Sequence, residues 1–248
     1  MTSEGTERTD LKGMTLPELE EFLSRWGKER YRARQLFRWI YQKHVDDFAA
    51  MTDLSKELRG ILVASCRISG FPAERVEISA DGTEKYLFRL EDGETVESVL
   101  IPEEGRRTLC ISSQVGCPLL CGFCATGEAG FRRNMTSAEI VQQACFAEER
   151  LAERGERLSN VVFMGMGEPL LNYDEVMKST GDEELATSAG LWAGLGGLTE
   201  GLDAALPVLG KIGKVLTRAD TLQRTGRLKK VPVTSREVSD LLMLGMGA

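Results

Sequence analysis

The sequence predicts an α/β fold, in which an N-terminal helical region is followed by a β meander and then by a strand–helix–strand unit. Three patterns carry this prediction. Apolar residues recur at helical spacing up to position 66, polar and apolar residues alternate around two turns after position 76, and two β-rich runs flank a capped helix after position 108. With 42% hydrophobic residues in 248, the chain can form a buried core.

The first region is expected to form helices from Leu16, over 31–44 and over 54–66. Residues 25–44 carry seven basic side chains against one acid, Glu29, with five aromatic residues among them, although the whole chain has a formal net charge of −7. Phosphates attract Lys and Arg, and unstacked bases stack on aromatic rings, so this composition suits RNA. An amphipathic helix pair with a solvated basic face would have the same composition.

Two Asp-Gly pairs, at Asp81 and Asp92, are hairpin signals within the alternating segment 76–102. Strands are then expected over 108–113 and 160–164, with a helix over 136–154 between them that opens with the capping box Thr136-Ser-Ala-Glu. These two strands would be parallel, and two parallel strands cannot close a barrel.

The most informative segment is Gly-Cys-Pro-Leu-Leu-Cys-Gly-Phe-Cys at residues 116–124. An iron–sulfur cube for electron transfer takes four thiolates, so a compact trio suggests a [4Fe–4S] cluster whose fourth iron is completed by S-adenosylmethionine. A structural zinc site needs four N or S ligands, and the chain has one His, His44. No apolar run of signal-peptide type begins the chain, so reduced thiols in a cytoplasmic protein are expected rather than disulfides. Cys66 and Cys145 lie in apolar patterns and are interpreted as buried residues.

The neighbourhood of this segment resembles the radical-SAM adenine-C2 methyltransferases of ribosomal and transfer RNA. The resemblance rests on Thr-Leu-Cys-Ile-Ser-Ser-Gln-Val-Gly-Cys at 108–117, on Gly-Phe-Arg-Arg-Asn at 130–134, and on Asn-Val-Val-Phe-Met-Gly-Met-Gly-Glu-Pro-Leu-Leu-Asn at 160–172. It extends from about Leu16 to about Lys178. It implies a helical RNA-binding accessory domain (1–75), a β meander (76–107), an incomplete radical-SAM (β/α) partial barrel (108–178) and a helical tail of other origin (179–248).

The resemblance also implies roles for the residues around the cluster. Cys117, Cys121 and Cys124 would hold the [4Fe–4S] cluster, and Phe123 would pack near the adenine of S-adenosylmethionine. Gly167 and Glu168 would meet the amino group of this cofactor, since glycine lets the backbone approach and a carboxylate suits an ammonium. A Gly-Glu pair after a strand is common in other α/β proteins.

Two further positions match catalytic residues of the family. Glu97 aligns with the general base that removes the C2 proton of the adenine adduct; a solvated position on an alternating strand would look the same. Cys110 aligns with the thiol that resolves a protein–RNA crosslink; a core cysteine in a strand is the alternative.

In the family, one S-adenosylmethionine methylates a cysteine near the C-terminus, and a second yields the 5′-deoxyadenosyl radical that activates this methyl group. The implied partners are 23S rRNA and tRNA, with an external electron donor such as flavodoxin. A monomer in the cytoplasm is expected. No run of about 20 apolar residues predicts a membrane span.

The chain departs from this family after Lys178. No cysteine follows Cys145, so the methyl carrier is missing, and so are the later strands that would hold the ribose and carboxylate of the cofactor. Residues 181–216 are rich in Gly, Ala and Leu, and 229–247 weakly resemble the opening region of ATP sulfurylases. We therefore expect the front of a methyltransferase joined to unrelated sequence and inactive by itself, with a non-catalytic iron–sulfur/RNA-binding fragment or an unstable fusion as alternatives.

Overall fold

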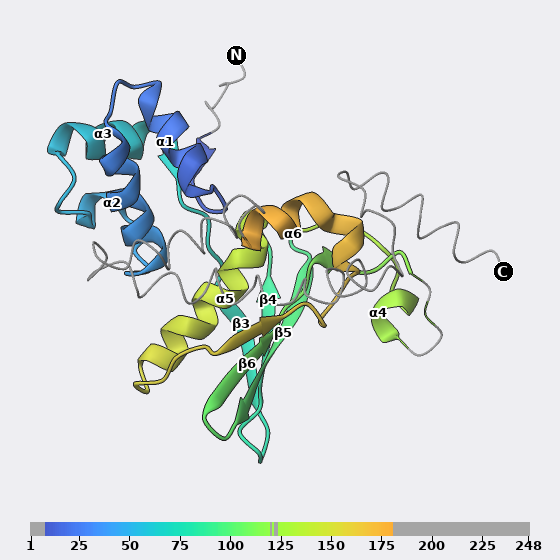
Figure 1. Cartoon of the computed structure of the whole chain (residues 1–248). Coiled ribbons are helices and arrows are strands. Elements are labelled where there is room, and N and C mark those ends of the chain that lie inside the picture. The colour runs from blue at the N-terminus through green and yellow to red at the C-terminus, as the bar shows by residue number, and fades with distance from the viewer. Residues whose placement is uncertain (1–7, 120, 122–123, 181–248) are drawn as a thin grey trace, which may run out of the picture.

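The computed structural model describes residues 8–119, 121 and 124–180. A helical module and a mixed sheet lie on opposite sides of one long helix, as Figure 1 shows. The predicted α/β class is confirmed. The predicted tail lies outside the described residues from position 181 on.

The helical module contains α1 (Leu16–Ser24), α2 (Arg30–Tyr41), the 3-10 turn η1 (Phe48–Ala50) and α3 (Lys56–Ser65). A capping box between Thr15 and Glu18 starts α1, and the Ser55 hydroxyl caps α3. The short strands β1 (Thr9–Asp10) and β2 (Cys66–Arg67) pair in parallel and close the module. The three predicted helices are confirmed, but α2 ends at Tyr41 rather than His44, which has a left-handed φ of 51°.

The main sheet has the strand order β3-β4-β5-β6-β9. Its strands are β3 (Ala73–Ile78), β4 (Glu84–Arg89), β5 (Thr95–Glu103), β6 (Arg106–Cys110) and β9 (Asn160–Val162). Both predicted Asp-Gly turns are present, with φ values of 84° at Gly82 and 88° at Gly93. The first three pairings are antiparallel and β6–β9 is parallel.

The strand expected over 108–113 is present but shifted: it begins two residues earlier than predicted and ends three residues earlier. β6 starts at Arg106, pairs with β5 on one side and β9 on the other, and stops at Cys110. It stops there because the Ser112 N–H donates to the Gln143 side chain (2.9 Å) instead of to a neighbouring strand. The meander and the parallel unit therefore share one sheet.

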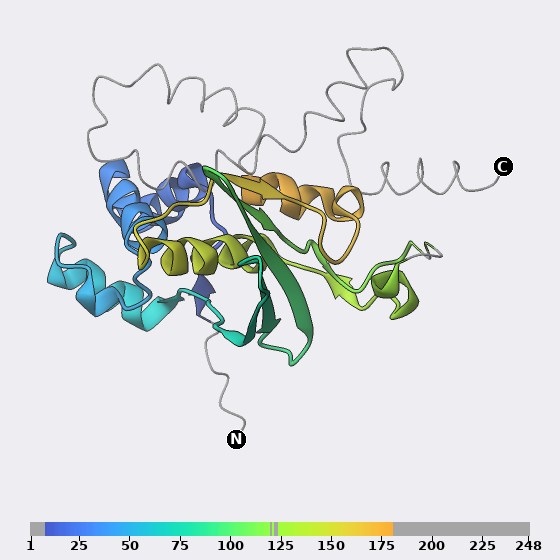
Figure 2. The ribbon, with the colours of Figure 1, turned by 90° about the horizontal axis from the view of Figure 1, so that it is seen from below.

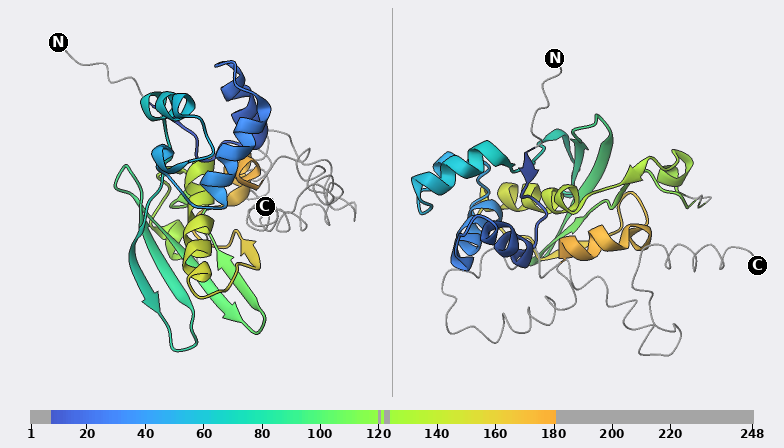
Figure 3. Two further views of the ribbon diagram at one scale, coloured as in Figure 1. Left: turned by 90° about the vertical axis from the view of Figure 1, so that its left-hand side faces the viewer. Right: turned by 90° about the horizontal axis from the view of Figure 1, so that it is seen from above.

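Helix α5 (Ser137–Ala152) lies between the helical module and the sheet, as Figures 2 and 3 show, and contributes to the hydrophobic core of each. Ile140 and Ala144 pack with the sheet, whereas Val141 and Cys145 pack with the helical module. The predicted capping box of Thr136 and Glu139 begins the helix, and α6 (Tyr173–Thr180) adds Val176 to the sheet core. None of the described helices is long and apolar enough to cross a membrane.

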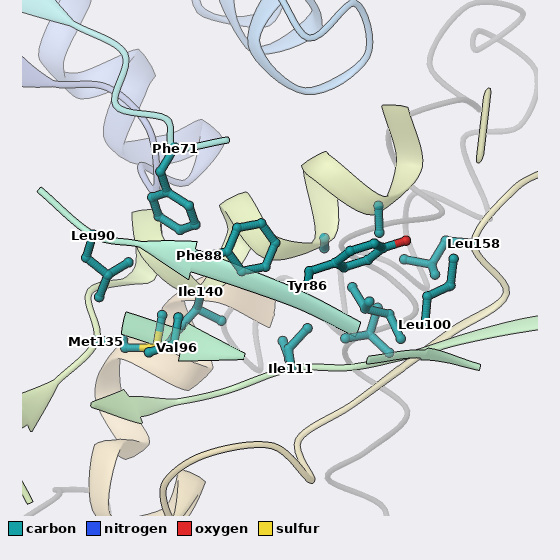
Figure 4. Packing of buried hydrophobic residues seen from close by; sticks show 14 of the residues in the cluster. Phe71, Tyr86, Phe88, Leu90, Val96, Leu100, Ile111, Met135, Ile140 and Leu158 are labelled. Carbon is teal, nitrogen blue, oxygen red and sulfur yellow. The ribbon is translucent and has the colours of Figure 1, made fainter. Parts of the chain in front are cut away.

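Aromatic rings of β4 fill the space under α5. Tyr86 and Phe88 are fully buried, and each packs edge-on against Phe146 of α5 with ring centroids 5.2 Å apart. Phe71 adds a further edge contact to Phe88 at the other end of this row (Figure 4). Cys66 and Cys145 are both buried, as expected.

A buried ion pair ties this sheet core to the end of α5. Glu84 on β4 is 2% exposed and accepts hydrogen bonds from Arg150, at 3.0 Å, and from Arg154. Burial alone would raise the pKa of Glu84, but the hydrogen bonds from Arg154 and Arg150 outweigh it and lower this pKa.

We expect Glu84→Gln to lower the free energy of unfolding at pH 7 by about 2 kcal/mol, since hydrogen bonds to a charged group are lost. Because the folded-state pKa is lowered, this contribution is complete above the unfolded-state pKa of about 4.3 and is lost as pH falls through the folded-state pKa. Urea unfolding from pH 7 down to pH 3 should show the difference between wild type and variant shrinking. Glu103→Gln, which removes an exposed partner of Arg106, is the control and should change little. A difference that stays constant with pH would contradict the assignment.

Candidate cluster and cofactor site

The cluster loop follows β6 and is defined here as residues 116–124. It leaves β7 (Gln114–Val115), which pairs with β8 (Arg133–Asn134). Gly116 has a φ of +73°, and a Cβ there would lie 1.8 Å from the Gly130 carbonyl oxygen. Only glycine fits this crossing, which fixes the start of the loop against the segment that follows α4.

The three cysteine thiols of this loop have different surroundings. Cys117 is buried, Cys124 is half-buried and Cys121 is exposed. Burial raises the pKa of Cys117, and the charges of Glu168, Cys124 and Cys121 raise it further. The amide N–H groups of Gly127 and Thr126, in the short helix α4 (Ala125–Glu128), lower the pKa of Cys124.

The donor chemistry of the loop fits an iron–sulfur cluster better than its present geometry does. The loop carries three soft thiols. Charge on Cys124 or Cys121 raises the pKa of Cys117. Among the described residues, however, no three His, Cys, Asp or Glu side chains converge as a metal site. Residues 120, 122 and 123 of the loop, including the predicted cofactor contact Phe123, lie outside the described part.

A second loop, residues 164–168, packs against residues 111–114, which lead into the cluster loop. We call it the cofactor loop. The Gly165 N–H donates to the Ile111 carbonyl (3.0 Å), and the Glu168 N–H donates to the Gln114 side chain (2.9 Å). Gly167 has a φ of +93°, and a Cβ there would lie 2.5 Å from the Cβ of Gln114. The absence of side chains at Gly165 and Gly167 therefore permits this close packing.

Glu168 begins the 3-10 turn η2 (Pro169–Asn172), where its Oε1 accepts from the Leu170 N–H at 3.1 Å. Below it, the buried Asn172 amide donates to the carbonyls of Ser113 (2.7 Å) and Met135 (2.8 Å). The Glu168 charge acts on Cys117, as noted above. The structure thus puts Glu168 near Cys117, while the roles of both residues stay predictions.

Glu97 and Cys110 lie on the sheet face opposite α5. On β5, the residues that alternate with Glu97 are buried against α5, and the register pairs Val99 with Cys110. The Glu97 carboxylate is 3.3 Å from the Lys85 Nζ and its side chain is 45% exposed. Cys110 is half-buried, and burial raises its pKa. The two candidate catalytic residues share one face without touching each other.

Sequence reasoning missed the polar side chains that join these parts. Ser112, Gln114, Gln143 and Asn172 are all nearly inaccessible to solvent, at 0–2% exposure. One signal could have identified Gln143: it is a polar residue on the core-facing side of an amphipathic helix. The hydrogen-bond partners of the other three residues are distant in sequence, so no local sequence pattern predicts these contacts.

Known proteins match most of the described region. The family Ribosomal RNA large subunit methyltransferase N-terminal domain matches residues 9–68. The Dual-specificity RNA methyltransferase RlmN of Geobacter sulfurreducens is 58% identical over 170 residues, 68% of this chain and 46% of that relative. The protein of the same name from Pelobacter propionicus is 56% identical over 172 residues, 69% of this chain and 48% of that relative.

A solved structure agrees. A radical SAM methyltransferase from Sphaerobacter thermophilus has a TM-score of 0.64 and 45% identity, over 69% of this chain and 50% of that one. Over the matched part, this chain is similar in sequence and fold to RlmN-type radical-SAM methyltransferases. The chain spans about half the length of these RlmN relatives. The predicted resemblance is thus confirmed, and the activity of the whole protein is a matter of proposal for this chain.

The packing of the cofactor loop can be tested at Gly167. Gly167→Ala should cost about 1–2 kcal/mol for the left-handed backbone and a further 1–3 kcal/mol for the clash with Gln114. Gly93→Ala is a matched control, because its φ is +88° and no atom lies within 4 Å of the added Cβ. It should cost the backbone contribution alone. Equal losses in urea unfolding for the two variants would show that the close packing at Gly167 is absent.

Proposed function

We propose that the chain carries the cluster-binding and cofactor-binding half of a radical-SAM RNA methyltransferase whose chemistry is methylation of adenine C2 in 23S rRNA and tRNA. The observation that supports it best is the packing of the cofactor loop on Gln114, two residues before the cluster loop begins. This arrangement brings Glu168 near enough to Cys117 for its charge to raise the pKa of that thiol.

In this proposal, Cys117, Cys121 and Cys124 hold a [4Fe–4S] cluster, and Phe123, Gly167 and Glu168 contact S-adenosylmethionine. The reduced cluster, when bound, supplies the electron that cleaves this cofactor. An external electron donor such as flavodoxin would provide that electron. The backbone at Gly167 lets the cofactor approach, and Glu168 can accept hydrogen bonds from its ammonium group.

The sheet face opposite α5, which carries Glu97 and Cys110, would receive the adenine. Glu97 is our candidate for the base that takes the C2 proton, and Cys110 for the thiol that releases the product. Lys85 lies between Glu77 and Glu97, at 3.3 Å from each carboxylate, and so helps to hold the Glu97 side chain in place on this face.

The helical module is our candidate for the RNA contact. Arg30 and Arg34 on α2 are 85% and 63% exposed, and among the described residues both are paired with the same acid, Glu20, at 3.7 and 3.8 Å. Tyr31 is exposed beside them, with Arg32 stacked at 4.5 Å from its ring centroid. Exposed arginines next to a ring suit phosphates and an unstacked base. We expect the chain to act as a monomer in the cytoplasm.

One observation favours a second candidate, an iron–sulfur and RNA-binding fragment without turnover. No cysteine follows Cys145 in the sequence, so no residue of this chain matches the methyl carrier. We expect the purified chain to transfer no methyl group from S-adenosylmethionine to rRNA or tRNA. Methylated adenine in such an assay would exclude this second candidate.

The cluster can be tested by anaerobic reconstitution. We expect about four irons per chain and a cubane EPR signal after reduction. Cys121→Ser should lose most of this iron, because its thiolate is one of three protein ligands. Cys66→Ala, which removes a buried thiol of the helical module, is the control and should retain the iron. An unchanged cubane signal in Cys121→Ser would refute the assignment.

RNA binding by the helical module can be tested by salt dependence. The double variant Arg30→Ala/Arg34→Ala should weaken binding of a 23S rRNA fragment and reduce the slope of log K against log salt by about 2, one for each lost phosphate contact. Arg75→Ala/Arg106→Ala removes two exposed, ion-paired arginines of the sheet and is the matched control. If both variants change the slope equally, the RNA does not bind at α2.

A further inference from the structure

The side chain of Gln143 uses all of its hydrogen-bonding groups inside the protein. It projects from α5 and is fully buried. Its Oε1 accepts from the Ser98 hydroxyl (2.6 Å) and the Ser112 N–H (2.9 Å), while its Nε2 donates to the Ser112 carbonyl (2.9 Å) and, more weakly, to the Glu139 carbonyl (3.4 Å). Gln143 thus holds both backbone groups of Ser112, as a neighbouring strand would.

Ser112, held in this way, connects two parts of the candidate site. Its hydroxyl donates to the Glu97 carbonyl at 2.6 Å and accepts from the Met166 N–H at 2.8 Å. Glu97 is the candidate base on β5, and Met166 is in the cofactor loop. Ser112 lies beyond the last residue of β6, so the sheet ladder does not fix its position.

We propose that Gln143 is a positioning residue: through Ser112 it sets the placement of the cofactor loop relative to the Glu97 strand. This inference rests on the proposed function for its meaning, because the two parts it joins are the candidate cofactor contact and the candidate base. Gln143 touches neither part itself, and its effect passes through the backbone and hydroxyl of Ser112.

The chemistry of the amide explains why this position carries glutamine. Only Asn and Gln offer an acceptor and two donors on one neutral side chain, and the longer stem of Gln reaches from α5 to the end of β6. Gln143→Met keeps the length and volume but leaves the Ser112 N–H and carbonyl without partners in a buried site. The segment around Ser112 should then separate from α5, and the cofactor loop should lose its contact with Ser112.

A purely structural role for Gln143 would also destabilise the protein, so a matched control is needed. Val141 is on the opposite face of α5, where it is 2% exposed and packs in the helical-module core. Val141→Ala should destabilise the same helix without touching Ser112. Comparing the two variants separates loss of stability from loss of positioning.

The first test is hydrogen exchange on the full chain without cofactor, followed by mass spectrometry of peptides that cover residues 164–168. We expect Gln143→Met to raise exchange in these peptides by about tenfold, the factor that corresponds to one lost hydrogen bond, while Val141→Ala leaves them at the wild-type rate. Ser112→Ala should reproduce the effect of Gln143→Met and serves if that variant fails to fold. Wild-type exchange in the Gln143→Met and Ser112→Ala variants, or an equal rise in all three, would overturn the proposal.

The second test uses the reconstituted chain and the change in its cluster EPR signal when S-adenosylmethionine is added. We expect Gln143→Met to keep the wild-type iron content but to need about tenfold more S-adenosylmethionine for the same spectral change, whereas Val141→Ala behaves as wild type. An identical titration for wild type and Gln143→Met would overturn the positioning role. If wild type binds no iron, the proposed function fails, and the hydrogen-exchange result still decides whether Gln143 positions the loop.

Discussion

The structure depends on one helix, α5, that packs against two hydrophobic cores at once. α5 presents Ile140 and Ala144 to the sheet and Val141 and Cys145 to the helical module. Contact at its start is so close that a Cβ at Gly13 would lie 2.4 Å from the backbone nitrogen of Ala138. A helix buried on two sides has little freedom to rotate or slide, because either movement would open a cavity in one core. The module, the sheet and the loops are therefore positioned relative to the same rigid element.

This constraint explains why a polar side chain is tolerated in the middle of α5. Near the carboxyl ends of β6 and β9 the parallel ladder stops, and the chain leaves the sheet as the cluster loop and the cofactor loop. Backbone groups there are buried but have lost their strand partners, so side chains must replace them. Gln143, Ser112 and Asn172 do this. Loops at the carboxyl edge of parallel strands are where α/β proteins bind ligands, and here buried side-chain amides hold the backbone of Ser112 and Ser113 at that edge.

Local chemistry made much of this fold predictable. The Asp-Gly turns at Gly82 and Gly93 and the capping boxes at Thr15 and Thr136 depend on residues only a few positions apart, and the structure contains all four. The end of β6 was not predictable, because it is set by Gln143, which is 31 residues away from Ser112. The cysteine spacing identified the cluster loop as a candidate ligand set, yet spacing alone carries no information about how Glu168 comes to lie near Cys117.

The register of the sheet determines where the candidate catalytic residues lie on the sheet face opposite α5. Val99 is opposite Cys110, and Glu97 lies two residues earlier along β5 on the same face, where its carbonyl accepts a hydrogen bond from the Ser112 hydroxyl. The candidate base, near the start of β5, and the candidate thiol, at the end of β6, therefore both lie toward the end of these strands from which the two loops emerge. A substrate bound on this face would meet Glu97, Cys110 and the cofactor loop within a few residues of one another. For these residues to act on one substrate, the cofactor loop must keep a fixed distance from β5. The Ser112 hydroxyl, which is hydrogen-bonded to both, provides this link.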